Sequence, residues 1–185
     1  MNSITSSSRA SHCVPRFDDG IARVKLADES DLLQIAKTLG EPLPSTRDGT
    51  LVETLKVMPS ESGHSNSMTS RFGMGSFPLH TDQAFKRRPP HYILLYHAPP
   101  ITSRGTTFVS LPAMEFTNEE LEYLRRGVWS VATGNSTFLS PILSTFPNMT
   151  SPILRYDPCI MNPICPFARR AADAIARVIL SLIHI

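Results

Sequence analysis

The stretch Gly75-Ser-Phe-Pro-Leu-His-Thr-Asp82 places an imidazole and a carboxylate two residues apart. Side chains at positions i and i+2 of a strand point to the same face of the strand. His80 and Asp82 are therefore predicted to converge on one metal ion, because an imidazole nitrogen and a carboxylate oxygen form two-thirds of the ligand set of non-haem Fe(II) sites. The alternative is a histidine that is hydrogen-bonded to a nearby aspartate in a turn. The pattern alone does not separate these two interpretations.

The composition is that of a globular chain with many loops. Hydrophobic residues make up 41% of the 185 residues and charged residues 18%, which allows a substantial core and argues against global disorder. The 16 prolines argue against a helical bundle. A formal net charge of +2 gives no indication of nucleic-acid or membrane binding. The 3 cysteines lack CxxC spacing, which favours reduced thiols, so we expect a cytoplasmic protein.

Strands are expected to outnumber helices beyond a disordered, Ser-rich leader at residues 1–20. Residues 21–185 are interpreted as one domain with strands at 23–27, 51–58, 91–98, 104–110, 128–133 and 152–156. Helices are predicted at 28–39, at 117–126 behind a capping box, and from 166 onward. This order of elements favours an antiparallel double-sheet architecture over alternating βαβ units. The expected fold class is therefore mostly β with flanking helices, or α+β.

Further features follow the His-Thr-Asp segment in a fixed order: Pro89-Pro90, the predicted strand over 91–98, and Gly105-Thr-Thr-Phe108. Over residues 26–163 the chain resembles the taurine dioxygenase/TfdA family of Fe(II)- and 2-oxoglutarate-dependent dioxygenases, within the clavaminate-synthase-like superfamily. The resemblance implies a double-stranded β-helix, or jelly-roll, core. It also implies that His80 and Asp82 bind Fe(II), with 2-oxoglutarate as co-substrate. Such an enzyme uses O2 and 2-oxoglutarate to hydroxylate a small-molecule substrate, and it forms succinate.

The resemblance and the sequence pattern suggest roles for three more residues. By its position in the Gly-x-Thr motif, Thr107 would hydrogen-bond the 2-oxoglutarate carboxylate. The family usually has two glycines before this threonine, and Arg104 replaces the first of them. Arg71 is a candidate for contact with the substrate, with a surface role as the alternative. His97 is either a structural residue of the predicted strand or part of the wall of the substrate pocket.

Two features of the family have no counterpart in the sequence. One is a second histidine ligand, and the other is an arginine that pairs with the distal carboxylate of 2-oxoglutarate in the bidentate geometry that suits arginine. The only histidine after Pro163 is His184, and its apolar surroundings favour a residue at the end of a helix. We therefore expect the chain to correspond to the N-terminal part of such an enzyme, with an incomplete jelly roll and impaired activity.

Three functions stay open at this point. The first is a 2-oxoglutarate-dependent hydroxylase, which His80, Asp82 and Thr107 favour. The second is a catalytically inactive domain that serves as a binding or interaction module, or is a degraded gene product; the missing histidine and arginine favour it. The third is a cupin-like metal protein, which would need more histidines near His80, whereas the sequence has no His-x-His pair.

Overall fold

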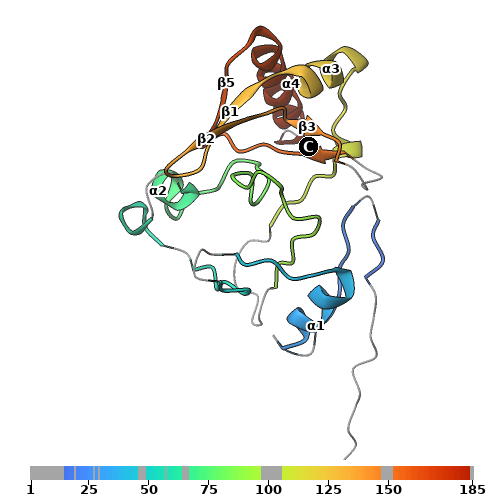
Figure 1. Ribbon diagram of the computed structural model, residues 1–185, viewed down its shortest axis with the longest axis vertical. Helices are drawn as coiled ribbons and strands as arrows, with labels where there is room; N and C mark the ends of the chain where they lie inside the picture. The colour runs from blue at the N-terminus through green and yellow to red at the C-terminus, as the bar shows by residue number, and fades with distance from the viewer. Residues whose placement is uncertain are drawn as a thin grey trace, which may run out of the picture. The chain divides into compact units, whose positions relative to one another are not determined.

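A computed structural model gives the structure of the chain, which divides into two compact parts (Figure 1). The first part comprises residues 1–53 and 92–110, and the second comprises residues 54–91 and 111–185. The described residues are 15–18, 20–26, 28, 30–45, 49–56, 58–63, 67–96, 106–146 and 152–183. They form a mixed α+β structure with small antiparallel sheets.

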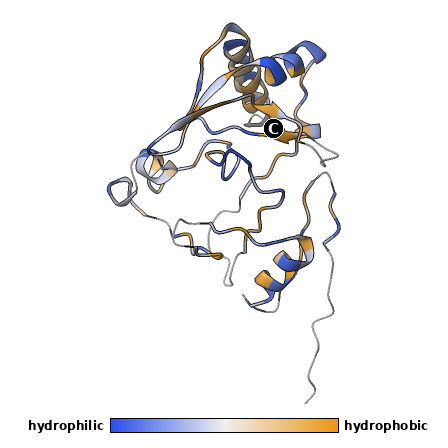
Figure 2. Cartoon of the chain, viewed as in Figure 1, coloured by the Kyte–Doolittle hydropathy of each residue, from blue (hydrophilic) through white to orange (hydrophobic). Residues whose placement is uncertain are grey.

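The first part contains the helix α1 (Ser30–Leu39), which confirms the helix predicted there. The Asp28 carboxylate stabilises the start of this helix, because it accepts hydrogen bonds from the Ser30 backbone N–H at 2.7 Å and from the Ser30 hydroxyl. Figure 2 shows hydrophobic and hydrophilic residues together on α1. None of its side chains is buried. The described core of the protein therefore lies in the second part.

The second part is organised on a three-stranded antiparallel sheet of order β2-β1-β5. The central strand β1 (Trp129–Ala132) pairs with β2 (Thr137–Ser140) and with β5 (Met161–Pro163). A separate two-stranded sheet is formed by β3 (Leu143–Ser144) and β4 (Ile153–Leu154). Trp129 and Val131 are buried on one face of β1, as the alternation of a half-buried strand requires.

Two helices pack beside these sheets, α3 (Asn118–Arg126) and α4 (Pro166–Ile183), as the sequence predicted. The capping box is present, since Glu120 N–H donates to Thr117 Oγ1 at 3.2 Å and Thr117 N–H donates to Glu120 Oε2 at 2.8 Å. Arg177 of α4 donates to the same Glu120 Oε2 at 2.8 Å. Shorter helices are the 3-10 turns η1 (Ser60–Ser62) and η2 (Leu111–Ala113) and the α-helix α2 (Met68–Phe72).

The core is formed where α3 and α4 meet the strands. Its members are apolar side chains from these elements and from the loops between them, among them Leu124, Trp129, Val131, Phe138, Ile142, Leu143, Ile160, Met161, Ala168, Ala171 and Ile175. The helical spacing predicted from residue 166 onward is confirmed, because Ala171, Ala174, Ile175 and Val178 are all buried. This core supports the loop that carries the candidate site, through the packing of Tyr156 on Trp129.

Four predicted strands are wrong over their described residues, which are 23–26, 51–56 with 58, 91–96 and 106–110. A strand needs a partner to accept its backbone hydrogen bonds, and β propensity does not supply one. Ile93 and Leu95, in the most strand-like stretch, are 45% and 50% exposed. The strands predicted at 128–133 and 152–156 are confirmed by β1 and β4, whereas β2, β3 and β5 fall in segments that were not predicted as strands.

The sheets of the described residues are small and open. Helices cover more of the described chain than strands do, so the expectation of a mostly β chain is not confirmed, and neither is a closed jelly roll. The leader expected at residues 1–20 lies mostly outside the described residues. Within the described part of the chain, no helix has the length and the apolar character needed to cross a membrane.

Candidate metal centre

His80 and Asp82 lie close together, but not for the reason that the sequence suggested. The segment is a loop that enters a turn over residues 82–85, so the predicted strand geometry is wrong. Even so, His80 Nε2 lies 3.2 Å from Asp82 Oδ1. The convergence of the imidazole and the carboxylate is thus present within a turn. This contact also matches the alternative interpretation of a hydrogen-bonded histidine and aspartate.

A backbone carbonyl fixes the orientation of the His80 ring. His80 Nδ1 lies 2.8 Å from the carbonyl oxygen of Pro78. Because a carbonyl oxygen can only accept, Nδ1 must carry a proton, and Nε2 is the nitrogen that faces Asp82. Histidines that bind metals usually hold their second ring nitrogen in this way, which fixes the tautomer and the ring plane.

The electrostatics of the pair favour a positive charge at Nε2. The hydrogen bond to Asp82 raises the pKa of His80 above its usual value, and burial of the ring opposes this shift. Smaller contributions that raise the pKa come from the Pro78 carbonyl and from the charge of Asp157. The side chains of His80 and Asp82 are 25% and 44% exposed, so an ion from solvent can reach them.

The spacing of the two side chains also suits a divalent cation. Two ligand atoms that each lie about 2.1 Å from a metal, at right angles, are about 3.0 Å apart. The observed separation of 3.2 Å between His80 Nε2 and Asp82 Oδ1 is close to this value. A neutral ring with its Nε2 lone pair facing a carboxylate is unfavourable, so either a proton or a cation must lie between the two atoms. The pair can therefore bind one or the other.

The segment that follows β4 holds the loop between the two candidate ligands. Thr81 N–H donates to the Tyr156 carbonyl at 2.7 Å, and Tyr156 N–H donates to Thr81 Oγ1 at 2.9 Å. Tyr156 in turn packs against Trp129 of β1 with ring centroids 6.4 Å apart. The candidate site is therefore attached to the core through Thr81. Sequence reasoning did not assign this role to Tyr156, because the two segments are distant in the chain.

Of the other predicted site residues, Arg71 is described in the same part of the chain as the pair, and its described hydrogen bond is to another segment. Arg71, in the last turn of α2, donates through Nη2 to the Cys159 carbonyl at 2.6 Å, so its described contact is within the protein. Thr107 is exposed, has no regular secondary structure and belongs to the first part of the chain. Its relation to His80 stays a prediction. His97 and His184 lie outside the described residues.

Among the described residues, no group of three or more His, Cys, Asp or Glu side chains is placed to hold a metal ion. His80 and Asp82 thus form a pair without a described third ligand. Two oxygen or nitrogen ligands are fewer than the three protein ligands that are typical of catalytic metal sites. The donor types fit Fe(II), and the described ligand set is incomplete.

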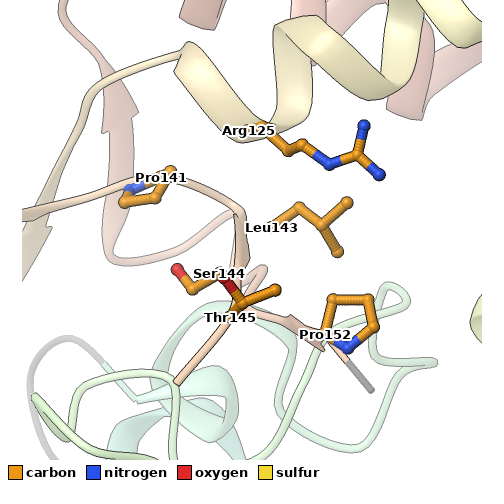
Figure 3. A pocket seen from close by; sticks show the side chains of 6 residues that line it. All are labelled: Arg125, Pro141, Leu143, Ser144, Thr145 and Pro152. Atoms are coloured by element: carbon orange, nitrogen blue, oxygen red, sulfur yellow. The ribbon is translucent and has the colours of Figure 1, made fainter. Parts of the chain in front are cut away.

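A shallow cavity of about 440 Å³ lies elsewhere in the second part of the chain (Figure 3). It is lined by Arg125 of α3 together with residues of β3 and the segments beside it, namely Pro141, Leu143, Ser144, Thr145 and Pro152. None of the residues predicted for the metal site lines this cavity. Arg125 also donates to Glu122 at 3.0 Å, so part of its charge is balanced locally.

Comparison with protein-family models, with curated proteins and with solved structures finds no match to this chain. The resemblance to the taurine dioxygenase/TfdA family therefore depends on the quoted motifs alone. The function has to be argued from the geometry of the described residues.

Proposed function

We propose that this chain carries the metal-binding pair of an Fe(II)- and 2-oxoglutarate-dependent dioxygenase, with His80 and Asp82 as the two ligands that it contributes. The observation that carries the proposal is the geometry of His80. Its Nδ1 proton is held by the Pro78 carbonyl, and its Nε2 lies 3.2 Å from Asp82 Oδ1. This arrangement leaves an imidazole lone pair and a carboxylate oxygen at the separation of two adjacent metal ligands.

Each residue of the pair has a distinct task in this proposal. His80 supplies a neutral nitrogen ligand whose direction is set by Pro78, and Asp82 supplies a negative charge that balances the cation. Bound Fe(II) would supply the activation of O2, with 2-oxoglutarate as the co-substrate. Thr107 is proposed to hydrogen-bond the carboxylate of 2-oxoglutarate, and Arg71 and His97 to face a small-molecule substrate. These three assignments come from the motif resemblance and from sequence position.

The proposal includes a jelly-roll core, of which the two described sheets would be parts. Both sheets are antiparallel, as the strands of a jelly roll are. The sheet order β2-β1-β5 also joins strands that are not consecutive in the chain, which is typical of such folds.

The second candidate is a catalytically inactive domain that binds a ligand or a partner. It is favoured by the absence of a third ligand among the described residues. In this case the His80–Asp82 contact would be a hydrogen bond that stabilises the turn. The two candidates differ in one measurable property, which is turnover of 2-oxoglutarate.

The test is succinate formation from 2-oxoglutarate by the purified chain with added Fe(II) and O2. The dioxygenase proposal predicts succinate in the wild type and its loss in His80→Ala. His91→Ala is the matched control, because His91 is an exposed histidine beside the Pro89-Pro90 segment. Fe(II) binding at His80 without succinate would favour the inactive domain. Equal succinate formation in wild type and His80→Ala would overturn the assignment of His80.

A further inference from the structure

Arg155 is the most deeply buried charged side chain of the described residues, with 3% of its surface exposed. It directly follows β4, and its N–H donates to the Ile142 carbonyl at 2.7 Å, which extends the ladder of the two-stranded sheet. This hydrogen bond attaches the backbone of Arg155 to the sheet. Burial of a guanidinium is unfavourable unless its donors are satisfied, so the partners of Arg155 require an explanation.

Those partners are three backbone carbonyls, one within the turn over residues 82–85 and two in the bend that follows it. Arg155 Nη1 donates to the carbonyls of Ala84 and Lys86, each at 2.5 Å, and Nη2 donates to the carbonyl of Arg87 at 3.0 Å. The guanidinium carbon also lies 5.1 Å from the centre of the Phe138 ring. A planar guanidinium with several fixed donors can hold three carbonyls at once, whereas an ammonium group cannot reproduce this fork.

The turn that Arg155 holds starts at Asp82. Gln83 adopts a left-handed conformation with φ of 59°, which a residue with a side chain rarely adopts without support from its surroundings. On the other side of Asp82, Thr81 is fixed by its hydrogen bonds to Tyr156, the neighbour of Arg155. Asp82 is thus held between two attachments that both come from the segment after β4.

We propose that Arg155 is the positioning residue of the His80–Asp82 pair. By holding the carbonyls of residues 84, 86 and 87, it keeps the left-handed turn at Gln83 and so directs the Asp82 carboxylate toward His80. Arg155 acts through the backbone of the turn and does not touch the metal ion or the substrate. The consequence for metal binding rests on the proposed function, whereas the consequence for the turn does not.

The test combines amide hydrogen exchange of the metal-free chain with Co(II) titration, in the wild type and in Arg155→Lys and Arg155→Met. We expect amides of residues 80–88 to exchange at least about tenfold faster in both variants, while amides in the middle of α4 keep their wild-type rates. We also expect Co(II) to bind about 10- to 100-fold more weakly, as for the loss of other groups that orient metal ligands. Arg155→Lys keeps the positive charge but loses the planar fork of donors. It allows the test to be made if Arg155→Met does not fold.

Arg87→Gln is the matched control. The Arg87 guanidinium also lies 5.1 Å from the centre of the Phe138 ring. Arg155, however, binds only the backbone carbonyl of Arg87, which the substitution keeps. Unchanged exchange at residues 80–88 in both Arg155 variants would overturn the proposal. So would an equal acceleration of the turn and of α4, because it would indicate a general loss of stability.

The two proposals fail in different ways. If the wild type and His80→Ala bind Co(II) equally, the metal assignment fails, and the exchange rates still decide whether Arg155 holds the turn. If His80→Ala weakens Co(II) binding but the Arg155 variants do not, the metal assignment stands and the positioning role is wrong.

Discussion

At the scale of single residues, the candidate site consists of one imidazole and one carboxylate, with His80 Nε2 lying 3.2 Å from Asp82 Oδ1. The hydrogen bond that the His80 ring donates to the Asp82 carboxylate raises the pKa of His80 in the folded chain. The pKa of His80 is thus higher in the folded chain than in the unfolded chain, where it is about 6.5. The protonated pair therefore contributes its full stabilisation at pH values below this unfolded-state pKa. This contribution is lost as the pH rises through the folded pKa.

The first prediction concerns this titration in the metal-free chain. The His80 ring, followed by NMR, should titrate with a midpoint above that of an exposed histidine. Asp82→Asn should move the midpoint down, because the amide cannot stabilise the imidazolium as a carboxylate does. Asp173→Asn, an exposed substitution on α4, should leave it unchanged. A His80 midpoint that is insensitive to Asp82→Asn would contradict the described contact.

The second prediction concerns Gln83, whose backbone conformation and buried side-chain oxygen are both unfavourable for the folded state. Its φ is 59°, and its side-chain Oε1 is buried without a described hydrogen-bond partner. Gln83→Gly should therefore be neutral or stabilising by up to about 1 kcal/mol, because glycine adopts positive φ freely. The control Gln34→Gly, in the middle of α1, should destabilise that helix by about 1 kcal/mol. Chemical denaturation measures the first change, and a clear loss of stability in Gln83→Gly would argue against strain at this position.

At the scale of elements, the three long helices α1, α3 and α4 were predictable because their signals are local. The capping box of α3 and the apolar spacing of α4 lie within a few residues of the backbone that they stabilise. Strands depend on partners that local patterns do not reveal, which is why residues 91–96 are not a strand despite their composition. The strand β1 was predictable, and it is also the strand with a partner on each side.

The third prediction tests the capping box. Thr117→Ala removes the hydroxyl that accepts the Glu120 N–H, and it should reduce stability by about 1 kcal/mol. Thr117→Ser keeps the acceptor and should lose only a few tenths of a kcal/mol, which makes it the matched variant. Equilibrium unfolding by urea compares the two. Equal stability of the alanine and serine variants would show that the cap contributes nothing measurable.

At the scale of the whole molecule, the described core belongs to the second part of the chain, and the candidate site is attached to it. Sequence reasoning found His80 and Asp82 because two chemically suited residues lie close in the chain. It could not find the roles of Arg155 and Tyr156, since Arg155 lies 71 residues along the chain from Ala84, and Tyr156 lies 75 residues from Thr81. The types of side chain that can bind a metal are recognisable in the sequence, whereas the long-range contacts that orient them depend on the fold.

The fourth prediction concerns the core at the contact between α3 and the strands. Leu124 is fully buried, so Leu124→Ala should reduce the free energy of unfolding by about 2–5 kcal/mol. Leu180→Ala is the matched control, because Leu180 on α4 is 57% exposed and should cost much less. Similar losses in both variants would contradict the described packing of α3.

We propose that His80 and Asp82 together bind a divalent iron ion. Anaerobic titration of the metal-free chain with Fe(II), followed by calorimetry, tests it directly in the wild type, His80→Ala and Asp82→Asn. We expect each substitution to weaken Fe(II) binding by at least about tenfold, with His91→Ala unchanged. Binding of Fe(II) with the same affinity in wild type, His80→Ala and Asp82→Asn would contradict the claim and leave the pair as a hydrogen bond within the turn.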